Sequence, residues 1–356
     1  MSALRHLSSL VAALLREDER RCLMGEDVRN GGMLGLSKAA AEDEDLRPRL
    51  LGSPLTNAAQ VVHAGGLALA GLRPIVLLPS SSALLEALAA LRELGRLPWR
   101  RGGRHAEGDP QDGNGNGESE PDEHPLPVLF VAPNGPGFGL GGEASESVEA
   151  SLAGVPGLEL WSAGRVEDLC PYLRSAADFD AATSDRIRVL LLPRSVLVTE
   201  LEPPEGETEV EISAPLGRPP TATLRAGDRA TVFAWGASVG PALRAAERCA
   251  AGSDDAPGFE VRVVEVGRLA PLDEDLLVEA ADATGKLVIA HSGPRSHGLG
   301  AELAALFAER SILHLDAPVL RVCGDLDSSS STGHAESSAS PTSAAIAAAL
   351  HTVVHY

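Results

Sequence analysis

The chain has 356 residues, with 50 acidic and 30 basic side chains and a formal net charge of −20 at pH 7. This length suggests about two domains at roughly 150 residues each, and a hydrophobic content of 44% excludes global disorder. Nucleic-acid binding is unfavourable, because phosphates need clustered cations and the only lysines are Lys38 and Lys286.

An apolar run at 10–15 ends at the charged stretch 16–21. It is far shorter than the roughly 20 residues needed to span a bilayer, so it predicts an amphipathic helix on the surface of the first domain and no membrane partner. The cysteines lie far apart without a CxxC pair, which indicates reduced, buried thiols in a cytoplasmic protein rather than disulfides or a metal site. They are Cys22, Cys170, Cys249 and Cys323.

Two polar tracts interrupt the chain. Residues 101–127 are rich in Gly, Pro, Asp and Glu, which predicts a mobile insert inside the first domain. The serine-rich tract 325–341 predicts another exposed loop. Because prolines and glutamates cluster just after residue 200, we expect a first domain at 1–200, a linker at 201–226 and a second domain at 227–356.

Short apolar runs alternate with helical patterns. The runs predict buried strands at 74–78, 128–131, 189–192, 230–235, 261–264 and 287–290. Helices are predicted at 242–251, between Ser238 and Gly252, and at 274–283, with Asp273 as a cap and Gly285 as a stop. Continuous hydrophobicity within the strands is typical of a sheet covered on both faces. The pattern therefore predicts an α/β fold with two domains and mainly parallel sheets.

Short motifs then follow one another in a characteristic order. They are GEDV at 25–28, GG at 31–32, PLT at 54–56, GGLALAGLRP at 65–74, PGL at 156–158, PLG at 215–217, PLD at 271–273, TGKLV at 284–288, GLGAE at 298–302 and APVLRV at 317–322. This order resembles the beta subunit of the thiamin-diphosphate-dependent decarboxylase component of 2-oxo-acid dehydrogenase complexes, of the pyruvate or branched-chain type. Only the two polar tracts fall outside the resemblance.

The resemblance implies a transketolase-like pyrimidine-binding domain followed by a transketolase C-terminal domain. It also implies an α2β2 heterotetramer in which thiamin diphosphate lies between the subunits. The alpha subunit would hold the diphosphate and its magnesium, the beta subunit would hold the aminopyrimidine, and a lipoyl acyltransferase core is a further implied partner. The chain has no GDG…N diphosphate motif and no metal site of its own, so it could not bind the whole cofactor alone.

The chain departs from the family at the pocket. In the family, a glutamate directly follows the PLS or PLT motif and gives a proton to N1′ of the pyrimidine. This chain has Asn57 at that position. An amide can donate a hydrogen bond to N1′, but it cannot transfer a proton. The substrate-facing histidine of the family aligns with Ala144, and Ser80 and Ser82 stand where the family has an aromatic residue and an acid. Ser292, after His291, replaces a glutamate. Asn57, Ser80 and Ser82 are thus degenerate cofactor-binding positions, and no catalytic residue is assigned.

Other readings of these residues stay open. Asn57 could be out of register, with Gln60 as a partial substitute. His63 could replace the acid, although a helical histidine is more often packed; His291 and His297 could face a subunit interface.

Two further patterns lie close to the pocket positions. The glycine-rich stretch 135–142 lacks a Gly-Lys-Ser/Thr ending and is expected to border the pocket rather than to bind a nucleotide. Glu143, Glu146 and Glu149 are expected to form a solvated acidic edge.

Two functions follow from these observations. The chain is either a beta-type subunit with a depleted catalytic pocket, which acts with an alpha subunit in oxidative decarboxylation and acyl transfer to lipoyl-lysine, or a non-catalytic paralogue with a scaffolding or regulatory role.

Overall fold

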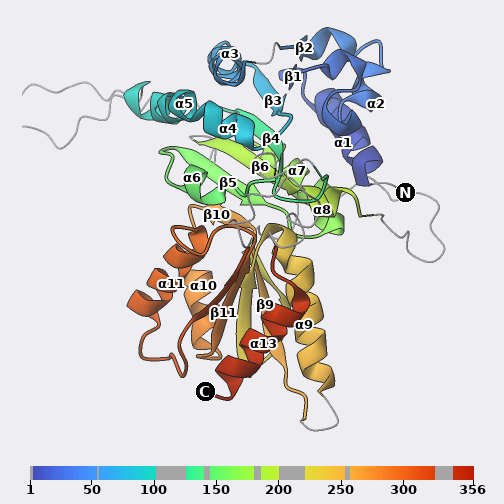
Figure 1. Cartoon of the computed structure of the whole chain (residues 1–356). Coiled ribbons are helices and arrows are strands. Elements are labelled where there is room, and N and C mark those ends of the chain that lie inside the picture. The colour runs from blue at the N-terminus through green and yellow to red at the C-terminus, as the bar shows by residue number, and fades with distance from the viewer. Residues whose placement is uncertain are drawn as a thin grey trace, which may run out of the picture.

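The computed structural model describes residues 3–53, 56–101, 126–139, 145–179, 186–199, 221–252, 257–324 and 340–356. These residues form two sheets with helices packed on both faces (Figure 1), which confirms the predicted α/β fold. The expected mobile insert at 101–127 and the loop at 325–341 lie almost entirely outside the described residues.

The first sheet has seven strands in the order β10-β5-β6-β4-β3-β1-β2, all parallel except β10. Its strands are β1 (Arg21–Gly25), β2 (Leu50–Gly52), β3 (Arg73–Leu77), β4 (Leu129–Asn134), β5 (Leu158–Ser162), β6 (Ile187–Pro193) and β10 (Arg268–Ala270). Its helices are α1 (Ala3–Glu17), α2 (Lys38–Ala41), α3 (Asn57–Leu69), α4 (Ser82–Glu86), α5 (Leu88–Arg101), α6 (Glu149–Ala153), α7 (Leu169–Ala177) and α8 (Arg194–Leu197). Short 3₁₀ turns occupy Val28–Asn30, Met33–Gly35, Arg47–Arg49 and Val166–Asp168.

The second sheet has five strands in the order β12-β11-β8-β9-β7, of which only β7 is antiparallel to its neighbour. Its strands are β7 (Thr221–Arg225), β8 (Ala230–Ala234), β9 (Val261–Val266), β11 (Leu287–His291) and β12 (Leu320–Cys323). Its helices are α9 (Val239–Ala251), α10 (Glu274–Asp282), α11 (Leu299–Arg310) and α13 (Ser343–Val354), with a 3₁₀ turn at Gly236–Ser238. Strand β7 lies inside the stretch predicted as a linker, so this sheet begins before residue 227.

Hydrophobic side chains cover both faces of the central strands. In β4, Phe130 and Ala132 belong to one core while Leu129 and Val131 belong to the core on the opposite face. Because successive side chains of a strand point to opposite faces, a strand buried on both sides needs an unbroken apolar run. This explains why all six strand predictions are confirmed.

The two sheets are joined by β10, which follows β9 in the chain but pairs with β5 of the first sheet. Ser162 at the end of β5 donates a backbone hydrogen bond to Gly267 (2.8 Å), and the Gly164 amide donates to the Glu265 carboxylate (2.9 Å). Asp273, predicted as a capping residue, makes no side-chain cap bond and instead pairs with Arg268 of β10. The carboxyl ends of the two sheets therefore face each other across this junction.

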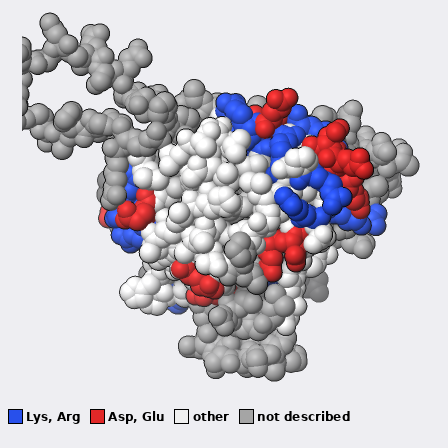
Figure 2. All heavy atoms as spheres, turned by 90° about the horizontal axis from the view of Figure 1, so that it is seen from above, with Lys and Arg blue, Asp and Glu red and all other residues white. Residues whose placement is uncertain are grey.

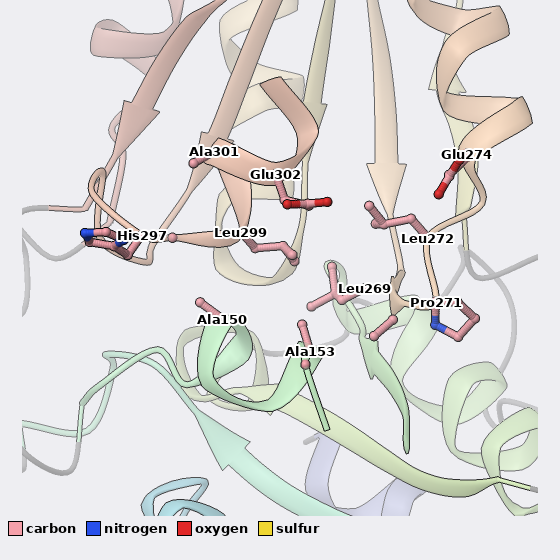
Figure 3. A pocket seen from close by; sticks show the side chains of 13 residues that line it. Ala150, Ala153, Leu269, Pro271, Leu272, Glu274, His297, Leu299, Ala301 and Glu302 are labelled. Carbon is pink, nitrogen blue, oxygen red and sulfur yellow. The ribbon is translucent and has the colours of Figure 1, made fainter. Parts of the chain in front are cut away.

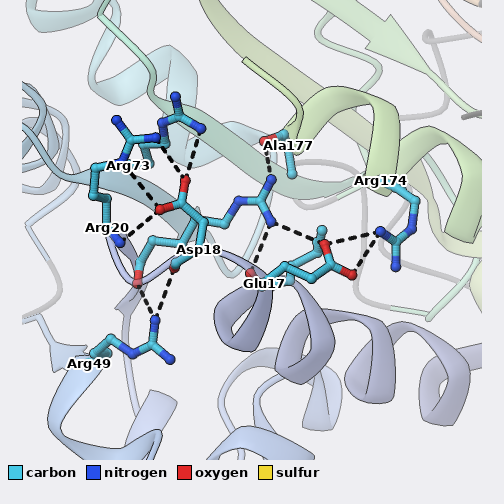
Figure 4. A network of polar contacts seen from close by, with 9 residues as sticks. Glu17, Asp18, Arg20, Arg49, Arg73, Arg174 and Ala177 are labelled. Carbon is cyan, nitrogen blue, oxygen red and sulfur yellow. Dashed lines mark hydrogen bonds and ion pairs between the residues drawn. The ribbon is translucent and has the colours of Figure 1, made fainter. Parts of the chain in front are cut away.

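The helix predicted around residues 10–15 is confirmed as α1, and among the described residues no helix is long and apolar enough to cross a membrane. A polar network fixes the turn between α1 and β1 (Figure 4). Asp18 accepts a hydrogen bond from Arg73 of β3 (2.9 Å), and Glu17 accepts one from Arg174 of α7 (2.9 Å). Burial acts to raise the pKa of Asp18, but hydrogen bonds from Arg20 and the charge of Arg73 outweigh it and lower the pKa.

All four cysteines are free. Cys22 and Cys249 are buried as predicted, whereas Cys170 and Cys323 are only half-buried, which corrects the prediction for these two. Burial raises the pKa of Cys22 and of Cys170 to about 11, so neither is a reactive thiolate at neutral pH.

Candidate functional site

Asn57 is the first residue of α3, directly after the loop that follows β2. Its Nδ2 donates a hydrogen bond to the Glu86 carboxylate at the end of α4 (2.6 Å). The reverse orientation of the amide would set two acceptor oxygens against each other, so the geometry fixes Nδ2 toward Glu86. Asn57 Oδ1 is buried and has no hydrogen-bond partner among the described residues. The side chain thus has an unused acceptor, while its donor is committed to a carboxylate.

Ser80 and Ser82 lie at the other end of α4. Their hydroxyls are 3.2 Å apart, and the Ser82 amide donates to Ser80 Oγ (3.2 Å). Ser80 Oγ also accepts a hydrogen bond from Nη2 of Arg194 (2.9 Å). Short α4 therefore connects the two serines to the Asn57–Glu86 pair, and the predicted cofactor positions are brought to one region.

Arg194 was not singled out from the sequence. It follows β6, is 1% exposed, and donates from Nη1 to the Gly135 carbonyl (2.6 Å) while its guanidinium lies 5.7 Å from the Phe138 ring centroid. The described part of the glycine-rich stretch packs here, since a Cβ on Gly137 would lie 2.6 Å from the Ser195 backbone nitrogen. A buried cation and two hydroxyls thus occupy the place where an aromatic residue and an acid were expected.

All these groups follow strands of the parallel sheet at their carboxyl ends, after β2, β3, β4 and β6. Ligands of open α/β sheets bind at this edge. Ala144, the other predicted family position, lies outside the described residues.

Two polar residues, Glu149 and His63, differ in burial from the sequence interpretation. Glu149 was expected on a solvated edge but is 5% exposed, and it accepts a hydrogen bond from Asn134 Nδ2 (3.0 Å). Burial raises its pKa. His63, expected to be packed, is exposed on α3, while Gln60 is fully buried.

His291 is buried at the end of β11 and does not face an exposed interface. Its ring stacks on Trp235, with centroids 4.6 Å apart, and its Nε2 lies 3.3 Å from Cys323 Sγ. Burial, together with the charge of Arg321, lowers its pKa to about 4, so the ring is neutral at pH 7. Ser292 makes a hydroxyl contact with Ser340 (2.9 Å). His297, by contrast, is exposed.

A groove of about 650 Å³ lies between α6 and the segments that start α10 and α11 (Figure 3). Its lining is mostly apolar, and its ionisable side chains are Glu274, His297 and Glu302. It shares no lining residue with the Asn57 region. The lining residues of this groove include no nucleophile paired with a base. The groove is therefore a candidate binding surface and not a candidate catalytic site.

The outer face of α3 is uncharged. Helix α3 carries no Asp, Glu, Lys or Arg, and it exposes Val62 (64%) and Leu69 (46%) beside Ala58, Ala59 and Gly66. Seen from above, a broad uncharged area lies between charged margins (Figure 2). Such a face is unusual on a chain of charge −20 and is typical of an interaction surface.

Residues 221–346 match the family model "Transketolase, C-terminal domain". The pyruvate dehydrogenase E1 component subunit beta of Staphylococcus epidermidis is 27% identical over 328 residues, covering 90% of this chain and 89% of that protein. The 2-oxoisovalerate dehydrogenase subunit beta of Bacillus subtilis is 26% identical, covering 91% and 90%.

Two solved structures show the same fold. "Split gene transketolase, inactive beta4 tetramer" has a TM-score of 0.70 and 19% identity, and covers 100% of this chain and 98% of that chain. "Transketolase from Leishmania mexicana" has a TM-score of 0.61 and 15% identity, and covers 99% and 45%. The resemblance found in the sequence is confirmed: over about 90% of its length the chain is similar to beta subunits of 2-oxo-acid dehydrogenase E1 components, and its C-terminal part matches a transketolase domain.

Proposed function

We propose that the chain acts as a beta-type subunit, paired with an alpha subunit in an α2β2 assembly, in the oxidative decarboxylation of a 2-oxo acid and acyl transfer to lipoyl-lysine. The uncharged face of α3 supports this, because it adjoins Asn57 and would be covered by the alpha subunit. A lipoyl acyltransferase core and a cytoplasmic location, favoured by four free thiols, belong to the same proposal.

The cofactor implied is thiamin diphosphate, which would supply a carbon nucleophile, with its magnesium held by the alpha subunit. The described residues fit only the aminopyrimidine end: the buried, unpartnered Oδ1 of Asn57 can accept a hydrogen bond from the exocyclic amino group, whereas the neutral ring nitrogens are themselves acceptors. Among the same residues no group of three or more His, Cys, Asp or Glu side chains that could hold a metal ion occurs.

The observation that carries the expected rate is the pairing of Asn57 with Glu86. Asn57 orients a bound ring but cannot exchange a proton with it. Its Nδ2 is committed to the Glu86 carboxylate, 2.6 Å away, so this ion holds the amide in one orientation. Losing one acid–base step costs about 10²–10⁴ in rate, so we expect a slow enzyme. The lack of a proton donor at residue 57 also favours the second candidate, a non-catalytic paralogue.

The test is an Asn57→Glu substitution in the co-expressed alpha–beta pair, assayed with a 2-oxo acid and a dye acceptor. We expect the variant to turn over about 10²–10⁴ times faster than the wild-type pair, because it restores a carboxyl group. Asn57→Gln is the matched control, since it has the same length but remains an amide. Equal rates for wild type and Asn57→Glu would contradict the role given to residue 57. No turnover in either pair would favour the non-catalytic paralogue.

A further inference from the structure

Two exposed histidines lie one helical turn apart at the end of α13. His351 is in the last turn of the helix and His355 is its C-cap residue. The apolar side of this turn faces inward, since Leu350, Val353 and Val354 are buried. The imidazole rings therefore project outward on the same side of the helix, as residues i and i+4 do. Their centroids are 6.0 Å apart and their planes differ by 12°.

The backbone sets the tautomer of His355. Its Nδ1 lies 2.8 Å from the His351 carbonyl oxygen, and its backbone amide donates to the same oxygen (3.2 Å). A carbonyl only accepts, so Nδ1 must carry the hydrogen and Nε2 keeps its lone pair. A hydrogen bond of this type on one ring nitrogen is the usual support for a metal on the other nitrogen.

The second ring is held by packing. Phe259 meets His351 edge to face, with centroids 4.9 Å apart, and also lies 6.4 Å from His355. Among the described residues, no hydrogen bond engages the ring nitrogens of His351. Both rings are thus oriented before any ligand arrives, which reduces the entropy lost on binding.

We propose that His351 and His355 form a two-histidine site for a divalent transition-metal ion, Cu²⁺, Ni²⁺ or Zn²⁺. Imidazole nitrogen suits these ions, whereas Mg²⁺ and Ca²⁺ prefer oxygen ligands. The site is therefore separate from the magnesium of the proposed cofactor. Water fills the remaining coordination positions, and the Lys286 ammonium, which donates to the Val354 carbonyl (2.8 Å), repels a cation nearby. Both effects keep the affinity moderate. Among the three ions we expect Cu²⁺ to bind most tightly, because it has the highest affinity for nitrogen ligands.

The test is calorimetric titration of the untagged full chain with Cu²⁺ and with Zn²⁺, for wild type, His351→Ala and His355→Ala. Both variants change exposed side chains, and circular dichroism confirms that they remain folded. We expect each to bind at least about tenfold more weakly than wild type, with Cu²⁺ tighter than Zn²⁺ and excess Mg²⁺ unable to compete. His63→Ala is the matched control, because His63 is an exposed helical histidine with no second histidine four residues further along the helix.

Electron paramagnetic resonance of the Cu²⁺ complex gives a second readout, since coupling to two imidazole nitrogens should fall to one in either variant. Unchanged affinity in both single variants, or an equal loss in His63→Ala, would overturn the proposal.

Discussion

Glu149 is a buried acid whose ionisation opposes folding. It is 5% exposed at the start of α6, and its one hydrogen bond to another side chain among those described comes from Asn134 Nδ2 (3.0 Å). Burial raises its pKa in the folded protein, whereas the unfolded chain releases this proton near its ordinary value of 4.5. The native state therefore binds more protons, and stability falls as pH rises from about 4.5 to the native pKa. The slope over that interval is about 1.4 kcal/mol per pH unit.

The substitution Glu149→Gln removes this dependence, because glutamine has nearly the shape of the protonated acid and never ionises. We expect the variant to match wild type near pH 4.5 and to exceed its stability at pH 8. Urea unfolding followed by circular dichroism at pH 5, 6, 7 and 8 measures the difference. Glu146→Gln is the control, since Glu146 is only half-buried. A constant difference between wild type and Glu149→Gln at every pH would refute the reasoning.

Two further predictions concern buried cations and rings. Arg194→Met should lower the free energy of unfolding by about 3 kcal/mol, because it removes charged hydrogen bonds to the Gly135 carbonyl and to Ser80. Chemical denaturation measures this loss, and a loss below about 1 kcal/mol would contradict the prediction. His291, with a pKa lowered from 6.5 to about 4, should make the protein about 3 kcal/mol less stable at pH 4 than at pH 7, because the unfolded state gains the proton first. His291→Phe should remove that part of the acid sensitivity, and an unchanged pH profile would contradict the assignment.

Much of the fold could be predicted because its signals are local. Strands β4 and β6 are continuous apolar runs, and Gly252 and Gly285 end α9 and the α10 turn with positive φ. Strand β10 was missed because a run of three residues is too short to show the alternation of apolar and polar side chains typical of a strand. Its partner β5 also lies more than 100 residues earlier in the chain.

The site was harder to predict, because its contacts join distant positions. Asn57, Ser80 and Ser82 could be named from motifs, but nothing in the sequence places Glu86 against Asn57 or buries Arg194. Glu149 looks like a surface acid until α6 is packed on the sheet junction. The HTVVH spacing at 351–355 was visible in the sequence, yet its tautomer depends on a backbone carbonyl that only the structure reveals.

The most direct test is a calorimetric titration of thiamin diphosphate and Mg²⁺ into this chain alone, into the alpha subunit of the same organism alone, and into their complex. If the chain supplies only the aminopyrimidine side of the site, saturable binding should occur in the complex and be absent for the isolated chain. Binding to the isolated chain with the affinity of the complex, or a stable complex that binds no cofactor, would contradict the account.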